Sequence, residues 1–217
     1  MQVLTEKVVE HGLRDKVLSE HQLDRLIGSS PASRYGLVNR ALKAHELIRI
    51  RRGLYVLPSK YRTVPPHPFA VAQALEPGSY ISFETALGAH GWIPEQVRVI
   101  ASVVPGRKSS RLEHPVLGSF TFHPLALQPA GFLELIERRP LGSQVALLAH
   151  PLRAIVDLIT LRRLDWQGMP WLTQGLRIEE TQLRTITQRQ VQTLLTVYKQ
   201  KRPRKFLQAF AQEMHLD

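Results

Sequence analysis

The stretch from Ser19 to Leu57 constrains the fold of this chain more than any other. Ser19 is a favourable N-cap residue, and the residues after it repeat apolar side chains at the spacing of one helical face. Gly28 ends that pattern and allows a left-handed backbone turn at low cost. Ser30 can then cap a second helix whose first position is Pro31, where the missing N–H is no loss.

A basic hairpin follows this second helix. The β-rich runs Leu47–Ile50 and Leu54–Leu57 flank Arg51, Arg52 and Gly53, and the glycine permits a tight turn. Helix, turn, helix and hairpin in this order predict a winged helix-turn-helix, a module that lays its second helix in the major groove of DNA.

The second helix is expected to present polar and basic side chains opposite its apolar face. Leu37, Ala41 and Leu42 fit the buried face, with Val38 beside it. Arginine can pair with guanine, serine and asparagine can contact base edges or phosphate, and a helix N-terminus suits a phosphate. The predicted DNA-binding residues of this helix and its cap are Ser30, Ser33, Arg34, Tyr35, Asn39, Arg40 and Lys43.

The hairpin supplies a second set of predicted DNA contacts. Alternation along its first strand places Arg49, Arg51 and Arg52 on the solvent side or at the tip, where a wing grips phosphates or a minor groove. Two alternatives remain open: a solvated edge beside a structural helix pair, or a protein-docking module. The charge distribution favours DNA, because residues 1–62 hold 12 Lys and Arg against 6 Asp and Glu.

The composition of the whole chain agrees with a nucleic-acid partner. Its 217 residues carry a net charge of +11, and the sequence pI is about 10.4. A basic balance of this size favours polyanions, and no long apolar run or lipidation signal indicates a membrane. The absence of cysteine excludes disulfides and cysteine-ligated zinc. The acidic residues near the N-terminus do not fit a signal peptide, so we expect a cytoplasmic protein.

A proline-rich segment divides the chain into two expected domains. Residues 1–60 form the winged helix-turn-helix, residues 61–68 a stiff linker with three prolines, and residues 69–217 a second domain. Strand and helix patterns alternate in that second domain, which predicts a small mixed α+β fold. The expected strands are Val97–Val104, Ser119–Phe122, Leu133–Ile136 and Gln144–Ala149, with a helix over Leu133–Arg138 as the alternative to the third. The expected helices are Phe69–Leu75, Phe83–His90, Leu152–Leu164, Gln188–Gln200 and Arg204–Met214.

A family resemblance appears in the order of four motifs. These are RIRRGLYVLP in the hairpin, then ALEPGSYISFETALGAHGWIPEQV, then VVPGR, then HPLRAIVDLITL. In this order they resemble the AbiEi-type antitoxins of type IV toxin–antitoxin, or abortive infection, systems. The likeness extends to about Leu164 and is most specific at Tyr80–Gly91 and Ala149–Leu161. The chain departs from the family pattern at His45-Glu46, where such proteins often place a glycine after the recognition helix.

The resemblance implies an activity for each domain. The N-terminal winged helix would bind operator DNA, which we expect to contain inverted repeats, and repress its own operon. The C-terminal domain would neutralise a cognate toxin that looks like a nucleotidyltransferase and is encoded nearby. A solitary regulator without a toxin partner is the alternative.

Catalytic and cofactor motifs are missing from the sequence. No phosphate loop, dinucleotide fingerprint or HExxH motif is present, and the histidines lack the spacing of metal ligands. Asp157 lies in an apolar segment four residues after Arg153, which predicts an ion pair. Glu84 lies in the first turn of a helix that Ser82 would cap, where it complements the helix dipole. A nuclease would need clustered carboxylates for Mg²⁺, so we expect no enzyme, cofactor or metal; the basic loop Pro105–Leu112 has no assigned role.

Overall fold

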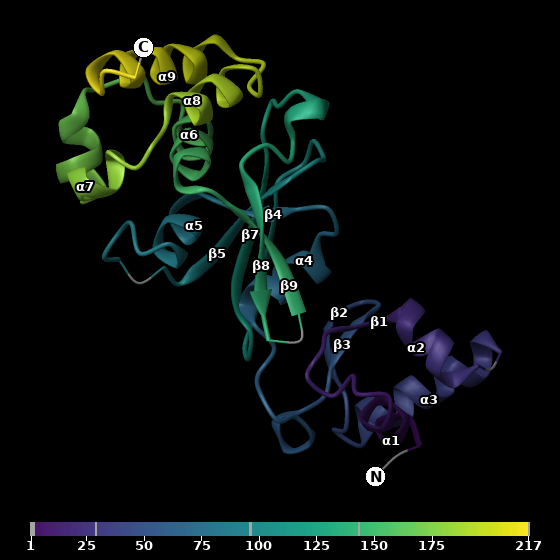
Figure 1. Cartoon of the computed structure of the whole chain (residues 1–217). Coiled ribbons are helices and arrows are strands. Elements are labelled where there is room, and N and C mark those ends of the chain that lie inside the picture. The colour runs from purple at the N-terminus through teal and green to yellow at the C-terminus, as the bar shows by residue number, and fades with distance from the viewer. Residues whose placement is uncertain (1–2, 29, 96, 143, 217) are drawn as a thin grey trace. The chain divides into compact units, whose positions relative to one another are not determined.

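The chain folds into two compact units of mixed helix and strand. A computed structural model describes residues 3–28, 30–95, 97–142 and 144–216 (Figure 1). One unit comprises Met1–Pro77 with Leu141–Gln144, and the other comprises Gly78–Pro140 with Val145–Asp217. The units divide after Pro77, whereas the sequence placed a linker at residues 61–68. No helix in the described part of the chain has both the length and the apolar character needed to cross a bilayer.

Four α-helices lie among the described residues of the N-terminal unit, and the termini of the second and third follow the local capping residues. Ser19 Oγ accepts a hydrogen bond from Gln22 N at 3.2 Å, while Gln22 Oε1 accepts one from Ser19 N at 2.9 Å. Gly28 adopts the left-handed conformation with φ 60°, and Ser30 caps the third helix with Pro31 in its first turn. These predicted caps are confirmed. The helices are α1 (Val3–Glu10), α2 (Glu20–Ile27), α3 (Pro31–Lys43) and α4 (Pro68–Leu75).

A three-stranded antiparallel sheet completes this unit. Its strands are β1 (Leu18–Ser19), β2 (Ile48–Arg51) and β3 (Leu54–Val56), with β3 in the centre. The predicted hairpin is therefore present to within one residue at each strand. A bulge between Arg49 and Arg51 shifts the register of β2 against β3. Gly53 turns the hairpin with φ 78°.

The core of the N-terminal unit forms where α1, α2 and α3 pack on the sheet. Val38 and Ala41 of α3 are the residues buried in it, whereas Leu37 and Leu42 lie at its margin and are only partly buried. The predicted apolar face of α3 therefore does face the core, with Leu37 and Leu42 packed against it on either side of Val38 and Ala41. The remaining members of the core are Leu4, Val8, Leu18, Leu23, Ile27, Leu47, Tyr55 and Leu57.

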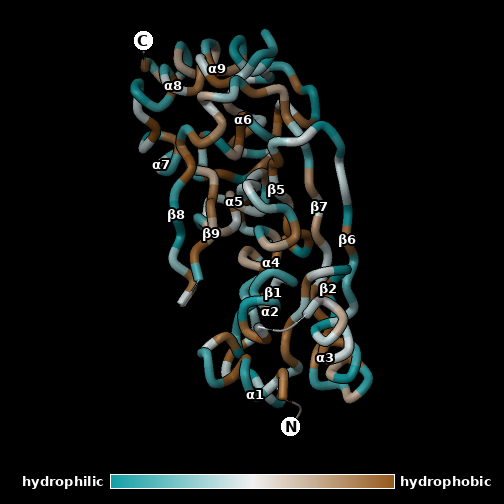
Figure 2. Tube along the Cα trace, turned by 90° about the vertical axis from the view of Figure 1, so that its right-hand side faces the viewer, coloured by the Kyte–Doolittle hydropathy of each residue, from teal (hydrophilic) through white to brown (hydrophobic). Residues whose placement is uncertain are grey.

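A six-stranded mixed sheet forms the frame of the C-terminal unit (Figure 1). Its order is β6-β7-β5-β4-β9-β8, in which β5 pairs parallel with β7 and β4 pairs parallel with β9. In Figure 2 the β6 trace runs outside β7. The strands are β4 (Tyr80–Ile81), β5 (Val99–Val104), β6 (Ser110–His114), β7 (Gly118–Pro124), β8 (Ile136–Leu141) and β9 (Gln144–Ala149).

Helices α5 and α6 pack together in this unit. A π turn, α7, α8 and α9 follow α6 along the chain. Residues 151–160 of α6 are all buried, as its apolar sequence predicted. The helices are α5 (Phe83–Ala89), α6 (Pro151–Arg162), α7 (Glu180–Leu183), α8 (Gln188–Leu195) and α9 (Lys201–Glu213), with a short 3₁₀ turn at Pro129–Gly131 and a π turn at Trp171–Gly175. Another 3₁₀ turn, Ser59–Tyr61, lies in the N-terminal unit.

Several element boundaries differ from the sequence expectation. Residues 133–135 form a turn, so the strand predicted at Leu133–Ile136 begins only at Ile136. The loop predicted at Pro105–Leu112 ends at Ser109, because β6 begins at Ser110. Helix α9 starts before Pro203 rather than after it, because a proline in the first turn lacks only an N–H that has no intrahelical partner there.

Candidate nucleic-acid interface

The outward face of α3 carries small, polar and cationic side chains. Ser33, Arg40 and Lys43 are exposed on it, and Gly36 lies between them. Tyr35 is the most exposed of the large apolar or aromatic side chains in the described chain, at 71%. The side chains of Arg40 and Lys43 take part in no hydrogen bond or ion pair among the described residues, so both cations are available to a ligand.

Arg34 occupies a different position on the same helix. Its guanidinium forms an ion pair with Asp24 of α2 and lies 3.8 Å from Glu20, and the side chain is only 17% exposed. Two carboxylates from the preceding helix therefore already neutralise the arginine that the sequence assigned to base reading. In this arrangement Arg34 fixes α3 against α2.

The three arginines of the hairpin also differ in their surroundings. Arg51 donates to the carbonyl oxygen of Leu75, at the C-terminus of α4, and lies 3.3 Å from Glu76 Oε1. Arg52 is exposed and has no hydrogen-bond or ion-pair partner among the described residues. Arg49 is exposed and lines a shallow depression with Asn39, Leu42 and Lys43 of α3.

The hairpin turn is fixed to the start of α2. Glu20 N donates a hydrogen bond to the carbonyl oxygen of Gly53 at 2.8 Å. A Cβ atom at Gly53 would lie 3.4 Å from Glu20 Oε2, and its φ of 78° is already unfavourable for other residues. This contact joins α2 to the hairpin, and neither residue was predicted as part of the site.

These side chains can bind a polyanion through one surface. Lys43 and Arg49 share the depression, Arg40 lies one turn before Lys43, and Arg52 lies beyond the bulge of the same hairpin. Asn39 adds a donor and an acceptor suited to base edges or phosphate. The structure therefore brings Asn39, Lys43 and Arg49 of the predicted set together in the depression and leaves Arg40 and Arg52 exposed. It ties Arg34 and Arg51 to other residues.

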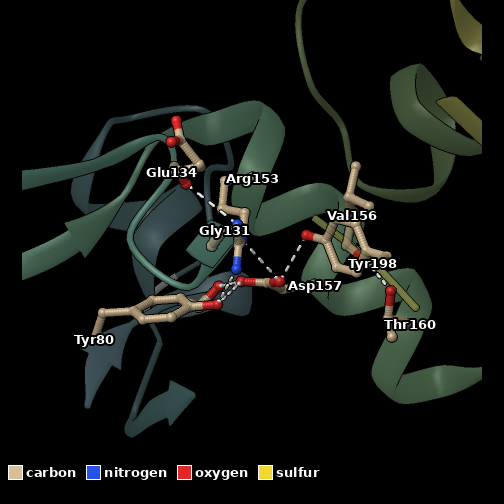
Figure 3. A network of polar contacts seen from close by, with 9 residues as sticks. Tyr80, Gly131, Glu134, Arg153, Val156, Asp157, Thr160 and Tyr198 are labelled. Carbon is tan, nitrogen blue, oxygen red and sulfur yellow. Dashed lines mark hydrogen bonds and ion pairs between the residues drawn. The ribbon is translucent and has the colours of Figure 1, made fainter. Parts of the chain in front are cut away.

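A second polar cluster lies inside the C-terminal unit (Figure 3). Arg153 and Asp157, both on α6, form the predicted ion pair with Nε and Oδ1 3.1 Å apart, and both side chains are fully buried. Tyr80 and Ser82 donate to Asp157 Oδ2 at 3.0 and 2.7 Å, and Tyr198 donates to Oδ1 at 2.7 Å. The carboxylate thus receives hydrogen bonds from three further segments of the chain.

The other donors of Arg153 are also occupied. Its Nη2 donates to Tyr80 Oη at 2.8 Å, and its Nη1 lies 3.3 Å from the carbonyl oxygen of Gly131 and 3.2 Å from that of Glu134. Burial raises the pKa of Tyr80 and Tyr198, and Asp157 raises it further. Burial lowers the pKa of Arg153, but Asp157, Tyr198 and Tyr80 together outweigh this effect and raise it above its ordinary value. The two charges of this buried cluster therefore balance, and the guanidinium donors of Arg153 are taken up by partners within the chain.

Ser82 belongs to this cluster rather than to the helix end that the sequence assigned to it. It occupies the N-cap position of α5, yet its side chain makes no capping hydrogen bond. The hydroxyl donates to Asp157 instead. Glu84, in the first turn of α5 as predicted, forms an ion pair with Arg162 of α6.

No group of three His, Asp or Glu side chains in the described residues is arranged to hold a metal ion. His90 and His150 approach each other with ring centroids 6.4 Å apart. His90 Nε2 donates to the carbonyl oxygen of Ala149 at 3.0 Å, and Arg139 lies 3.3 Å from its Nδ1. Burial lowers the pKa of both histidines.

The comparisons with known proteins give no family for the chain. No protein-family model matches the sequence, and no curated protein matches it with significant similarity.

Proposed function

We propose that the N-terminal unit is a winged helix-turn-helix that binds double-stranded DNA, and that the protein acts as a transcriptional repressor. The observation that carries this proposal is the group of cations on α3 and the hairpin. Arg40, Lys43 and Arg52 are exposed and have no partner among the described residues, and Arg49 lines a depression with Lys43. Exposed cations along one helix and the adjacent hairpin suit the spaced phosphates of a duplex.

The proposal gives the residues of α3 separate roles. Tyr35 and Asn39 would contact base edges in the major groove, where asparagine can pair with adenine. Arg40 and Lys43 would contact phosphates beside the groove, and Ser33 would add a hydrogen bond near the helix N-terminus. Arg34 would position the helix through its ion pair with Asp24 rather than read a base.

The hairpin residues would form the wing. Arg49 and Arg52 would contact phosphates on either side of the bulge in β2. Arg51 would act through α4, because its guanidinium already binds the carbonyl oxygen of Leu75. The expectation that all three arginines contact DNA directly is thereby narrowed to two.

A binding experiment tests this assignment. Duplexes selected from a random pool by the full chain would serve as the probe in gel shifts across a salt series. The triple variant Arg40→Ala, Lys43→Ala, Arg52→Ala should reduce the slope of log K against log salt by about 0.9 for each phosphate contact removed. Lys205→Ala, an exposed cation on α9, is the matched control. An unchanged affinity and slope in the triple variant would refute the proposal.

A second proposed function concerns the C-terminal unit. The two stretches that resemble AbiEi-type antitoxins most specifically, Tyr80–Gly91 and Ala149–Leu161, supply Tyr80, Ser82, Arg153 and Asp157 to one buried cluster. The two stretches that carry the resemblance thus meet in one buried cluster, and this supports the proposal that the C-terminal unit is the part that neutralises a nucleotidyltransferase-like toxin. The test is co-expression of the full chain with the protein of the adjacent reading frame. The triple variant of the DNA surface should still relieve toxicity, and continued growth arrest with the wild-type chain would reject the assignment.

A further inference from the structure

The six-stranded sheet has two outer strands, and they differ in how well they can pair with a strand of another chain. β6 and β8 lie at its two ends. β6 pairs with β7 on one side, and no backbone hydrogen bond joins Ser110–Glu113 to another described segment on the other side. Figure 2 shows β6 running along the outer side of β7. Unpaired strand backbone of this kind can pair with a strand of another chain.

The sequence of β6 is complementary to itself in the antiparallel direction. If two copies pair about Leu112, Arg111 of each lies opposite Glu113 of the other, and Ser110 lies opposite His114. In a two-fold interface each cross-strand pair occurs twice, so both charges of each copy find an opposite charge. Arg111 and Glu113 now pair with each other along one strand and are 63% and 65% exposed.

Leu112 would join the two copies on the other face of the sheet. It lies opposite Phe120 of β7 in the register of the sheet, and Phe120 is fully buried. Leu112 itself is only partly buried, because no strand lies beyond it. A second β6 would place Leu112 against Leu112 and extend the apolar row from Phe120 across the interface.

The opposite edge of the sheet is unsuited to the same pairing. β8 also carries an acidic and a basic residue two positions apart, with Glu137 Oε1 and Arg139 Nη2 2.7 Å apart. Pairing Glu137 with Arg139 of a second copy would bring Arg138 against Arg138, two like charges in direct opposition. Pro140 in the same strand has no N–H to donate. The edge at β6 has neither obstacle.

We propose that the protein forms a symmetric dimer in which two β6 strands pair antiparallel about Leu112, joining two six-stranded sheets. The dimer carries two N-terminal units, and its use in reading an operator with inverted repeats rests on the proposed DNA-binding function. The two-fold symmetry of the strand pair matches the two-fold symmetry of such an operator.

The mass of the protein in solution, measured by light scattering without DNA, tests the pairing. The wild-type chain should have about twice its monomer mass of 24.7 kDa. Arg111→Glu gives β6 two acidic side chains, and Glu113→Arg gives it two basic ones. Each variant alone should raise the dimer dissociation constant about tenfold or more, because both cross-strand pairs become like-charged. An equimolar mixture of the two variants should form a heterodimer.

Two further variants keep the test decisive. The double variant Arg111→Glu, Glu113→Arg restores opposite charges in every cross-strand pair and should dimerise like the wild type. Glu137→Arg on β8 is the matched control and should leave the dimer unchanged. A wild-type chain that is still monomeric at a protein concentration of about 100 micromolar would overturn the proposal. Single variants that dimerise as well as the wild type would also overturn it. Neither result depends on DNA, so loss of the dimer and loss of DNA binding are separable outcomes.

Discussion

Ser82 Oγ donates a hydrogen bond of 2.7 Å to Asp157 Oδ2, joining the start of α5 to the middle of α6 across 75 positions of sequence. Both residues are buried. Tyr80 and Tyr198 donate to the same carboxylate, and Arg153 neutralises it. Asp157 is therefore the point at which a strand, two helices and the segment before α9 meet.

Removal of the carboxylate at this point should destabilise the C-terminal unit strongly. Asp157→Ala leaves the buried guanidinium of Arg153 without its counter-charge, and breaking a buried ion pair costs about 3–5 kcal/mol. Denaturant unfolding of the variant and the wild type measures the difference. Glu180→Ala is the matched control, because Glu180 pairs with Arg184 at the same i, i+4 spacing but both side chains are at least 70% exposed. The control should change stability by about 0.5 kcal/mol or less.

The fold could be predicted in the parts where neighbouring residues determine it. Ser19, Gly28 and Ser30 end and begin helices through contacts within three or four residues, and those helix ends were predicted. The role of Ser82 could not be predicted, because its hydroxyl has two competing partners. One is a backbone N–H close in sequence, and the other is a carboxylate whose position depends on the tertiary fold.

The candidate site was predictable in composition and less so in geometry. The spacing of Arg40 and Lys43 on a helix places both on the outward face, as the sequence indicated. The contact of Arg34 with Asp24 depends on how two helices cross, and that of Arg51 with Leu75 depends on a helix 24 positions away. The crossing angle of α2 and α3 and the position of α4 do not follow from the local sequence pattern. The sequence therefore assigned both Arg34 and Arg51 to DNA.

The neighbouring arginines of the wing should separate stability from DNA binding. Arg51→Ala removes a cation from the C-terminal carbonyls of α4, where such a charge contributes about 0.3–1 kcal/mol. Arg52→Ala removes an exposed side chain without a partner among the described residues and should leave stability unchanged. Thermal unfolding and gel shifts on both variants check this. The expected pattern is a lower melting temperature for Arg51→Ala and weaker DNA binding for Arg52→Ala; the reverse pattern would contradict the wing assignment.

A similar separation is expected on α3 between Arg34 and Tyr35. Arg34→Ala removes the ion pair with Asp24 and should lower the free energy of unfolding by about 1 kcal/mol. Tyr35 is 71% exposed, so Tyr35→Ala should change stability by about 0.5 kcal/mol or less while weakening the binding of selected duplexes. Tyr35→Phe is the control for a contact made by the ring alone. Full DNA affinity in Tyr35→Ala would exclude the ring from the interface.

Stability should fall as the pH is lowered, in part because His90 and His150, two neighbouring and partly buried histidines of the C-terminal unit, have lowered pKa values. Burial lowers the pKa of His90 and His150 in the folded state, and His90 lowers that of His150 further. Below about pH 6.5 the unfolded chain therefore binds more protons than the folded chain, and the free energy of unfolding decreases as the pH falls through the lowered pKa values.

Replacement of both histidines isolates their share of this effect. The double variant His90→Gln, His150→Gln should lose less stability than the wild type between about pH 7 and pH 5. This pH range includes the reference histidine pKa of about 6.5. Glutamine can still donate to the carbonyl oxygen of Ala149, which His90 Nε2 now does. His21→Gln, at an exposed position on α2, is the control and should leave the slope unchanged. Denaturant unfolding at each pH gives the slopes directly, and a double variant with the wild-type slope would show that protonation of this pair does not set the acid stability.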